Sequence, residues 1–266
     1  MSHEPARLGY GVTGDLDPDL VRRLAPAVER AGLRTLWVNQ PARGDALATM
    51  AAAAEATGTL RIASGVLPVD HVPPAEIVRR VRELELPVDR VVLGVGASTG
   101  PSPLATVREA VRTLTDELGV PVVVGALGPR MRRLAARESA GMVLNWLTPS
   151  AARGAVADKH RDVADLGRDA TVALYVRGAL GERAHAVARR EADRYAGIAS
   201  YAANFARLGF AAPEAAVLAE TAEELRARLT PYTEVLDETV VRGVTATGAL
   251  DEHRALVDAV ADGASS

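Results

Sequence analysis

Short apolar runs alternate with amphipathic stretches of helical length along almost the whole chain. Runs such as Val91-Val92-Leu93 and Val122-Val123-Val124 contain no polar position, which is typical of parallel strands that are covered on both faces. The pattern predicts eight strands, at residues 8–12, 35–39, 61–67, 90–95, 121–125, 141–147, 171–177 and 239–245.

Helices are predicted between these strands because aspartate, proline and glycine stand where helices begin and end. Asp17-Pro18 begins a helix that stops at Gly32, and Asp45 begins another that ends near Gly58. The other predicted helices start at Pro73-Pro74, cover residues 103–118 and 130–140, and run from Pro149 to near Gly167. The interval 182–236 is too long for one helix, so two or three are predicted there.

Strand–helix alternation repeated eight times predicts an α/β protein with a closed (β/α)8 TIM barrel, carrying extra helices between strands seven and eight. A doubly wound sheet of eight strands is the alternative. The length of 266 residues lies within the range of single barrels, so residues 1–266 are predicted to form one domain.

Composition narrows the chemistry. The chain has no cysteine, which excludes thiolate nucleophiles and cysteine-bound metal clusters, so redox chemistry would need a cofactor. With 31 basic and 34 acidic residues it lacks the basic excess of nucleic-acid-binding proteins. The sequence contains neither a signal peptide nor a long apolar segment, so we expect no membrane association, a cytoplasmic location and a small-molecule substrate.

The strand ends that would form a barrel active site are poor in acids and bases. Glycines, amides and hydroxyls dominate there: Thr13-Gly14-Asp15, Asn39-Gln40, Asp70-His71, Gly96-Ala97-Ser98, residues 125–128, Asn145-Trp146 with Thr148, Arg177, and Thr245 with Thr247. No two histidines have the spacing of helical metal ligands, so no metal site is predicted. His71 either lines the pocket or lies at the surface, and Lys159, in a predicted helix, is interpreted as a solvated side chain.

The turn Gly125-Ala126-Leu127-Gly128-Pro129-Arg130 leads directly from a strand into a helix. Its backbone N–H groups and the helix dipole would favour an anion such as a phosphate, to which Arg130 would add charge. The alternative is a tight connection with glycine for steric reasons and Pro129 at the first helical position.

Two further features are open to more than one interpretation. Gly94-Val95-Gly96 resembles half of a dinucleotide fingerprint but equally suits a compact loop. Tyr195, Tyr201 and Phe205 lie at near-helical spacing and indicate one packed helix face, with Asn204 as the polar exception.

The stretch from Val124 to Met131, then Leu134-Ala135, and then Ala140-Gly141 leading to Leu144-Asn145-Trp146-Leu147-Thr148-Pro149 resembles the luciferase-like monooxygenases, particularly their actinobacterial branch. Leu93-Gly94-Val95-Gly96, Gly65-Val66-Leu67-Pro68, and Ser200-Tyr201 through Phe205 to Phe210 extend the resemblance over nearly the whole chain.

This resemblance implies an enzyme, a flavoprotein-like oxidoreductase or monooxygenase, that binds coenzyme F420 or, as the alternative, FMN. It places the phosphate at Gly125, Ala126, Leu127, Gly128, Pro129 and Arg130, and it brings Asn39, Gly96 and Asn145 close to the ring or its polyol chain. It also implies a non-prolyl cis peptide between Gly65 and Val66 behind the ring, and it is compatible with a homodimer.

The chain departs from the family pattern after the second strand, where Gln40-Pro41 replaces the acidic residue and histidine of many members. The resemblance therefore identifies no catalytic residue. Hydride transfer between the bound ring and a small organic substrate is the first hypothesis, and a cofactor-binding or structural barrel that has lost turnover is the second. A sugar- or aldol-type barrel enzyme is disfavoured because no lysine reaches a strand end.

Overall fold

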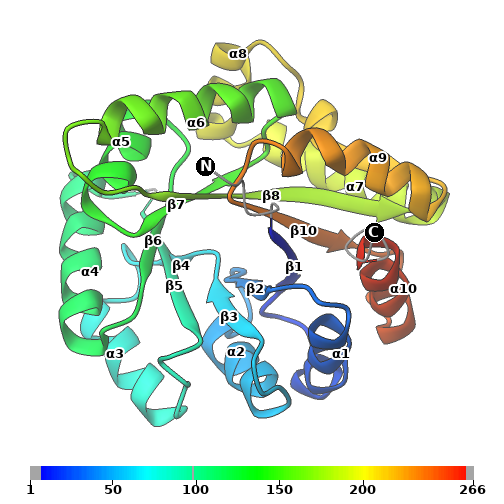
Figure 1. Cartoon of the computed structure of the whole chain (residues 1–266), viewed down its shortest axis with the longest axis horizontal. Helices are drawn as coiled ribbons and strands as arrows, with labels where there is room; N and C mark the ends of the chain where they lie inside the picture. The colour runs from blue at the N-terminus through cyan, green and yellow to red at the C-terminus, as the bar shows by residue number, and fades with distance from the viewer. Residues whose placement is uncertain (1–6, 98, 262–266) are drawn as a thin grey trace.

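The computed structural model describes residues 7–97 and 99–261, so Ser98, at the end of the fourth predicted strand, lies outside the described residues. Eight parallel strands form the barrel (Figure 1). They are β1 (Arg7–Thr13), β2 (Thr35–Asn39), β3 (Arg61–Ser64), β5 (Val91–Gly96), β6 (Val122–Gly125), β7 (Gly141–Asn145), β8 (Thr171–Leu180) and β10 (Glu238–Val244). Pairing of β10 with both β1 and β8 closes the sheet, which confirms the predicted (β/α)8 barrel.

Helices surround the strands as an outer layer (Figure 1). They are α1 (Pro18–Arg30), α2 (Ala46–Glu55), α3 (Pro74–Glu83), α4 (Pro103–Leu118), α5 (Pro129–Glu138), α6 (Pro149–Val163), α7 (Glu182–Ala196), α8 (Ala199–Leu208), α9 (Ala222–Thr233) and α10 (Leu250–Ala261). A proline in the first turn starts each of α1, α3, α4, α5 and α6, where its missing N–H costs no hydrogen bond. The prolines that predicted these helix starts act as expected.

The third predicted strand is not continuous. β3 ends at Ser64, the peptide bond between Gly65 and Val66 is cis, as the resemblance implied, and the chain resumes as β4 (Leu67–Pro68), which pairs with β5. A Cβ atom at Gly65 would lie 2.3 Å from the hydroxyl of Tyr175, so only glycine fits beside this phenol. The prediction of a single strand over residues 61–67 was therefore wrong at this point.

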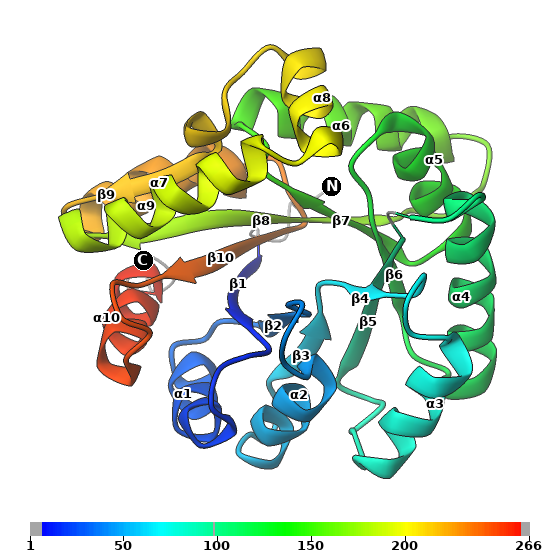
Figure 2. The ribbon, with the colours of Figure 1, turned by 180° about the vertical axis from the view of Figure 1, so that it is seen from behind.

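The long interval before β10 holds more than the predicted helices. After α7 and α8, a 3₁₀ turn (Ala212–Ala215) leads into β9 (Ala216–Ala219), followed by α9. β9 pairs with Arg177–Leu180 of β8, which runs past its predicted end, and both lie side by side in Figure 2. Four residues of Ala-Val-Leu-Ala carry too little pattern to predict a strand, and only the extended edge of β8 gives them a partner.

Two apolar layers hold the barrel together. Inside it, Trp37 and Tyr175 meet edge to face, with ring centroids 5.9 Å apart, among small and β-branched residues. The larger layer fills the space between strands and helices. In the described part of the chain, no helix is both long and apolar enough to cross a membrane.

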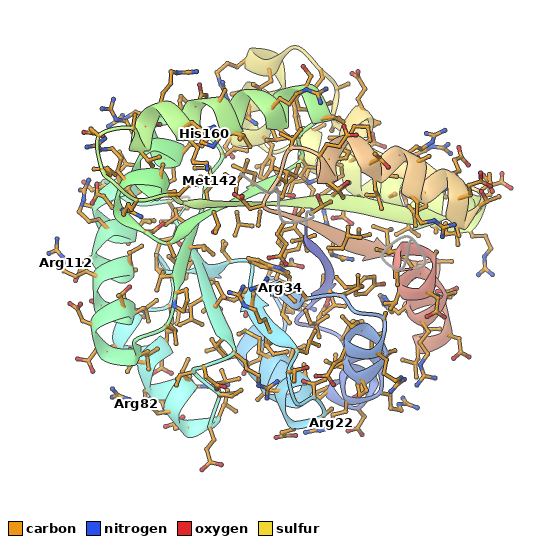
Figure 3. All side chains as sticks on the ribbon, viewed as in Figure 1. Arg22, Arg34, Arg82, Arg112, Met142 and His160 are labelled. Atoms are coloured by element: carbon orange, nitrogen blue, oxygen red, sulfur yellow. The ribbon has the colours of Figure 1, made fainter. Side chains whose placement is uncertain are left out.

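Charged residues mainly occupy the outer surface. The side chains of Arg22, Arg82 and Arg112 extend away from the helices that carry them (Figure 3). Lys159 is the opposite case, because it is buried on α6 and its Nζ donates a hydrogen bond of 2.8 Å to Asp169. The interpretation of Lys159 as a solvated side chain was wrong, since its helix face packs inward.

Candidate functional site

A cavity of about 640 Å³ lies at the carboxyl ends of the barrel strands. This volume is within the usual range of sites for small molecules and cofactors. Segments that follow β2, β3, β5 and β6 line one part of it, and side chains from β7, β8, β10, α7 and α8 line the rest. In a barrel this end is where active sites form.

Most of the residues that the sequence predicted for a cofactor meet in this cavity. The lining includes Asn39, Gly65, Val66, Gly96, Gly125, Ala126, Leu127, Gly128 and Asn145. Pro129 and Arg130 are not part of the lining: Pro129 opens α5, and Arg130 lines a separate depression with Arg108 and Arg133. His71 is also absent from the lining, whereas its neighbour Asp70 belongs to it.

Glycines and one valine form the wall along β4, β5 and β6. The side chain of Val66 enters the barrel mouth, where a Cβ at Gly96 would come within 2.8 Å of it and a Cβ at Gly125 within 3.0 Å. Gly65 makes room for Tyr175 in the same way. Because these glycines have no side chains, Val66 and the backbone together form the surface of this wall.

The turn after β6 ends in the exposed start of a helix. Gly128 is the N-cap of α5 and has no side chain with which to cap it, and the N–H groups of a first helical turn lack partners within the helix. A Cβ at Gly128 would meet nothing within 4 Å, so the space in front of this helix is open. The arrangement suits an anion at the end of the cavity.

Positive charge at this end comes from two arginines that the sequence analysis did not single out. Arg207 of α8 lines the cavity and bonds to the side-chain oxygen of Asn204. Arg132 of α5 is 5 % exposed, and its Nε has no hydrogen-bond partner among the described residues. Burial and then the neighbouring Arg207 lower the pKa of Arg132 to about 10, so the Arg132 guanidinium is charged at neutral pH.

A buried polar network forms the opposite wall. Arg177 of β8 is 4 % exposed, donates to Glu191 of α7 at 3.0 and 3.1 Å, and bonds to the side-chain oxygen of Asn145. The Asn145 Nδ2 in turn donates to the Tyr201 hydroxyl at 3.0 Å. The guanidinium of Arg177 also lies over the ring of Trp146, 4.2 Å from its centroid. Each of these polar groups holds the next in place.

Burial and neighbouring charges together set the protonation states of the groups in this wall. Burial would raise the pKa of Glu191, but Arg177 and Arg242 lower it, and the net direction is downward, so the carboxylate stays charged. Burial raises the pKa of Tyr201 to about 12, so its phenol keeps its proton at neutral pH. Burial also raises the pKa of Tyr175.

Several polar atoms in the lining lack partners in the described part of the chain. They are Asn39 Oδ1, the Tyr175 hydroxyl and Asn204 Nδ2. Gln40 is different, because its amide accepts from the Ala46 N–H and donates to the carbonyls of Pro41 and Gly44, which fixes the loop before α2. The cavity thus offers free hydrogen-bonding groups, but Gln40 is already engaged in the loop.

The sequence of this chain matches a known protein family. The family model of the luciferase-like monooxygenases matches residues 1–110 and 102–265. No curated protein matches the chain.

Among solved structures, an F420-dependent secondary alcohol dehydrogenase in complex with an F420-acetone adduct is 17 % identical, with a TM-score of 0.76 over 97 % of this chain and 99 % of that chain. The coenzyme F420-dependent tetrahydromethanopterin reductase from Methanopyrus kandleri is 15 % identical, with a TM-score of 0.73 over 97 % and 98 %. A 3,6-diketocamphane monooxygenase from Pseudomonas putida in complex with FMN is 11 % identical, with a TM-score of 0.71 over 96 % and 97 %. At these identities the likeness establishes the fold.

Proposed function

This chain belongs to the luciferase-like monooxygenase family, and from that premise we propose that it is an oxidoreductase that holds a flavin or deazaflavin coenzyme in the cavity at the barrel mouth. There it transfers a hydride between the coenzyme ring and a small organic substrate. Coenzyme F420 is the first choice and FMN the alternative, and the similar structures include proteins named with each of the two coenzymes.

One observation carries this proposal: the cavity combines a flat glycine-rich wall with unpartnered polar atoms at defined places. A buried polar atom without a hydrogen bond costs free energy, and a bound ligand with complementary groups removes that cost. The residues present therefore fit a planar polar ring with an anionic tail.

The residues divide according to the part of the coenzyme that each would hold. The turn from Gly125 to Gly128, with Arg207 and Arg132 nearby, would hold the phosphate. Gly65, Val66 and Gly96 would support the ring, and Asn39 would bond to a polar edge or to the polyol. Asn145 is already bonded on both sides, so it would act mainly by keeping Arg177 and Tyr201 in position.

The coenzyme supplies the hydride chemistry, and the chain supplies orientation, exclusion of water and a hydrogen-bond donor. The Tyr201 oxygen accepts from Asn145, which leaves the phenolic proton free to be donated into the cavity. With a pKa of about 12, Tyr201 stays protonated at neutral pH and can donate a hydrogen bond to a substrate oxygen on which negative charge develops.

Titration of the purified protein with F420 and, separately, with FMN tests this function, with quenching of coenzyme fluorescence as the signal. Gly128→Asp is the informative variant, because Asp is a good N-cap and has room at this position, while its charge would repel the phosphate. We expect the dissociation constant to rise by about tenfold or more, which corresponds to a loss of about 1.4 kcal/mol.

Gly154→Asp is the matched control. It introduces the same charge at an exposed position of α6 where a Cβ also meets nothing within 4 Å, and it lies outside the cavity lining. Binding of neither coenzyme would refute the proposed function. If the two aspartate variants bind the coenzyme equally well, the phosphate does not bind at the β6–α5 turn.

A coenzyme-binding barrel without turnover is the second candidate, and the engagement of Gln40 in its loop favours it. A glutamine amide has no titratable group, and that of Gln40 stabilises its own loop, so Gln40 does not replace an acid or a base at this place. Tight coenzyme binding without oxidation of any reduced nicotinamide or deazaflavin donor would support this candidate over the first.

A further inference from the structure

Charged side chains in the cavity are mostly cationic. The lining contains Arg177, Arg207 and Arg242, and among its described residues Asp70 is the sole carboxylate. Asp70 Oδ2 already accepts from the N–H and the hydroxyl of Thr99. The lining therefore presents more positive than negative charge to a ligand.

The three arginines differ in how they are compensated. Arg177 forms an ion pair with Glu191, with 3.0 Å between Nη2 and Oε1. Neither Arg207 nor Arg242 forms an ion pair with any carboxylate in residues 7–97 and 99–261. Arg242, which is half-buried on β10, makes one hydrogen bond, from Nη1 to the carbonyl of the adjacent Gly243.

The two uncompensated arginines lie at separate places. Arg207 lines the cavity together with Gly128 and Met131 at the start of α5, and its charge lowers the pKa of Arg132 on that helix. Arg242 is on β10, which is separated from β6 in the barrel by β7 and β8. Its charge acts on Tyr10, Tyr175, Glu191 and His253. A phosphate bound at the β6–α5 turn would therefore not neutralise the charge of Arg242.

A guanidinium group has five N–H donors in a planar fork that matches a carboxylate. The charge of Arg242 acts on Glu191, but the hydrogen bonds and the ion pair of that carboxylate are with Arg177. Partly buried positive charge without a partner is costly, and a second anion in the cavity would balance it.

We propose that Arg242 binds a carboxylate of the organic substrate, so that the cavity accepts two anionic groups, the coenzyme phosphate beside Arg207 and a substrate carboxylate beside Arg242. The inference rests on the proposed function for the identity of the first anion. The substrate class is thus a small organic acid, held by its carboxylate on the β8–β10 side of the barrel mouth.

The test compares benzoate with benzamide, which have nearly the same shape and differ in charge. Binding of each to the coenzyme-loaded protein is measured by calorimetry or ligand-observed NMR. Because hydrogen bonds to a charged group stabilise a complex by more than neutral ones, we expect benzoate to bind about tenfold more tightly than benzamide. Arg242→Gln should abolish this preference, and Arg242→Lys should keep part of it.

Arg194→Gln is the matched control, since Arg194 also acts on Glu191 but does not line the cavity. It should leave the preference for benzoate unchanged. Thermal unfolding of Arg242→Gln and Arg242→Lys verifies that both variants are folded.

Three results would overturn the inference. One is equal binding of benzoate and benzamide to the wild-type protein. Another is a benzoate preference that survives Arg242→Gln but disappears in Arg207→Gln, which would place the anion at the phosphate end. The third is a loss of coenzyme affinity in Arg242→Gln with the benzoate preference intact, which would assign Arg242 to the coenzyme.

The same titration on protein without coenzyme separates this inference from the proposed function. If neither F420 nor FMN binds, a benzoate preference that depends on Arg242 would still support the carboxylate site while the oxidoreductase assignment fails. If a coenzyme binds and benzoate shows no preference, the reverse holds.

Discussion

The two walls of the cavity are built in opposite ways. Along β4, β5 and β6 the wall is made of small and apolar residues, and its shape depends on the absence of Cβ atoms at the glycines that surround Val66. Along β7 and β8 the wall consists of large polar and aromatic side chains, each bonded to or stacked on the next. The first wall provides space and backbone donors, whereas the second provides fixed charge and hydrogen-bond direction.

This difference predicts different responses to substitution. Where the wall depends on glycines, adding a side-chain atom should destabilise the fold, and removing an atom from the residue opposite should restore part of the stability. A wall made of buried charges should fail when one partner is removed, because the other is left without compensation. The following four substitutions or conditions test this contrast.

The largest effect is expected for Arg177→Leu. It leaves the carboxylate of Glu191, whose side chain is 12 % exposed, without its ion-pair partner, so we expect a loss of about 3 kcal/mol in the free energy of unfolding, measured by urea denaturation at pH 7. Adding Glu191→Gln should recover part of that loss, because the uncompensated charge is then gone. A double variant no more stable than Arg177→Leu would argue against a charge-based wall.

Gly96→Ala should cost about 1–3 kcal/mol of unfolding free energy, the usual range for an overpacked site. The added Cβ would lie 2.8 Å from Val66 Cγ2. Val66→Ala in the same protein should restore part of the stability by removing that methyl group, and chemical denaturation of the single and double variants measures it. Strictly additive losses would show that the two residues do not share the space.

Tyr201→Phe should cost about 1 kcal/mol, because Asn145 Nδ2 loses its acceptor while the ring packing stays. Tyr195→Phe is the control, since the Tyr195 hydroxyl makes no hydrogen bond with the described residues although its ring packs against Tyr201, with centroids 4.8 Å apart. Thermal and urea unfolding of both variants compare them. An equal loss in the two variants would contradict a role for the hydroxyl.

The smallest effect is expected from pH. The folded-state pKa of Glu191 lies below the ordinary value of 4.5, so its contribution to stability is present above that pH and is lost as the pH falls through the folded pKa. The stability difference between wild type and Glu191→Gln should therefore shrink below about pH 4.5. A difference that stays constant from pH 7 to pH 3 would show that Glu191 does not act through its charge.

Much of the candidate site follows from local signals in the sequence. The glycine-bracketed turn after β6 lines the cavity as far as Gly128, and Asn145 lies at the end of β7 as predicted. Arg177 also lines the cavity, but it lies inside β8, which continues to Leu180. Arg242 was missed although a signal exists: in Glu238-Thr239-Val240-Val241-Arg242 the period of two places Arg242 on the same strand face as Val240, which points into the barrel. Arg242 lies inside β10, two residues before its end at Val244, and not in the segment that follows the strand.

The choice among the arginines near α5 could not be made from the sequence. Arg130 and Arg132 are two positions apart on α5, and the tertiary structure decides what each side chain meets. Arg130 lines a separate depression, whereas the charges of Asp158 on α6 and Arg207 on α8 act on Arg132. The sequence identified Asn204 as a polar residue on an apolar helix face, but it did not predict the bond between Asn204 and Arg207.

The sequence by itself determined the order of strands and helices, since hydrophobic periodicity and the prolines and glycines at element ends act over a few residues. It also determined the positions of the turn after β6 and of the Gly65–Val66 peptide, through a resemblance carried by short motifs. Only the tertiary structure decided the β9 pairing, the burial of Lys159, the network from Glu191 to Tyr201 and the isolation of Arg242. These features depend on side chains that meet only after the barrel has closed, and no local pattern encodes such a meeting.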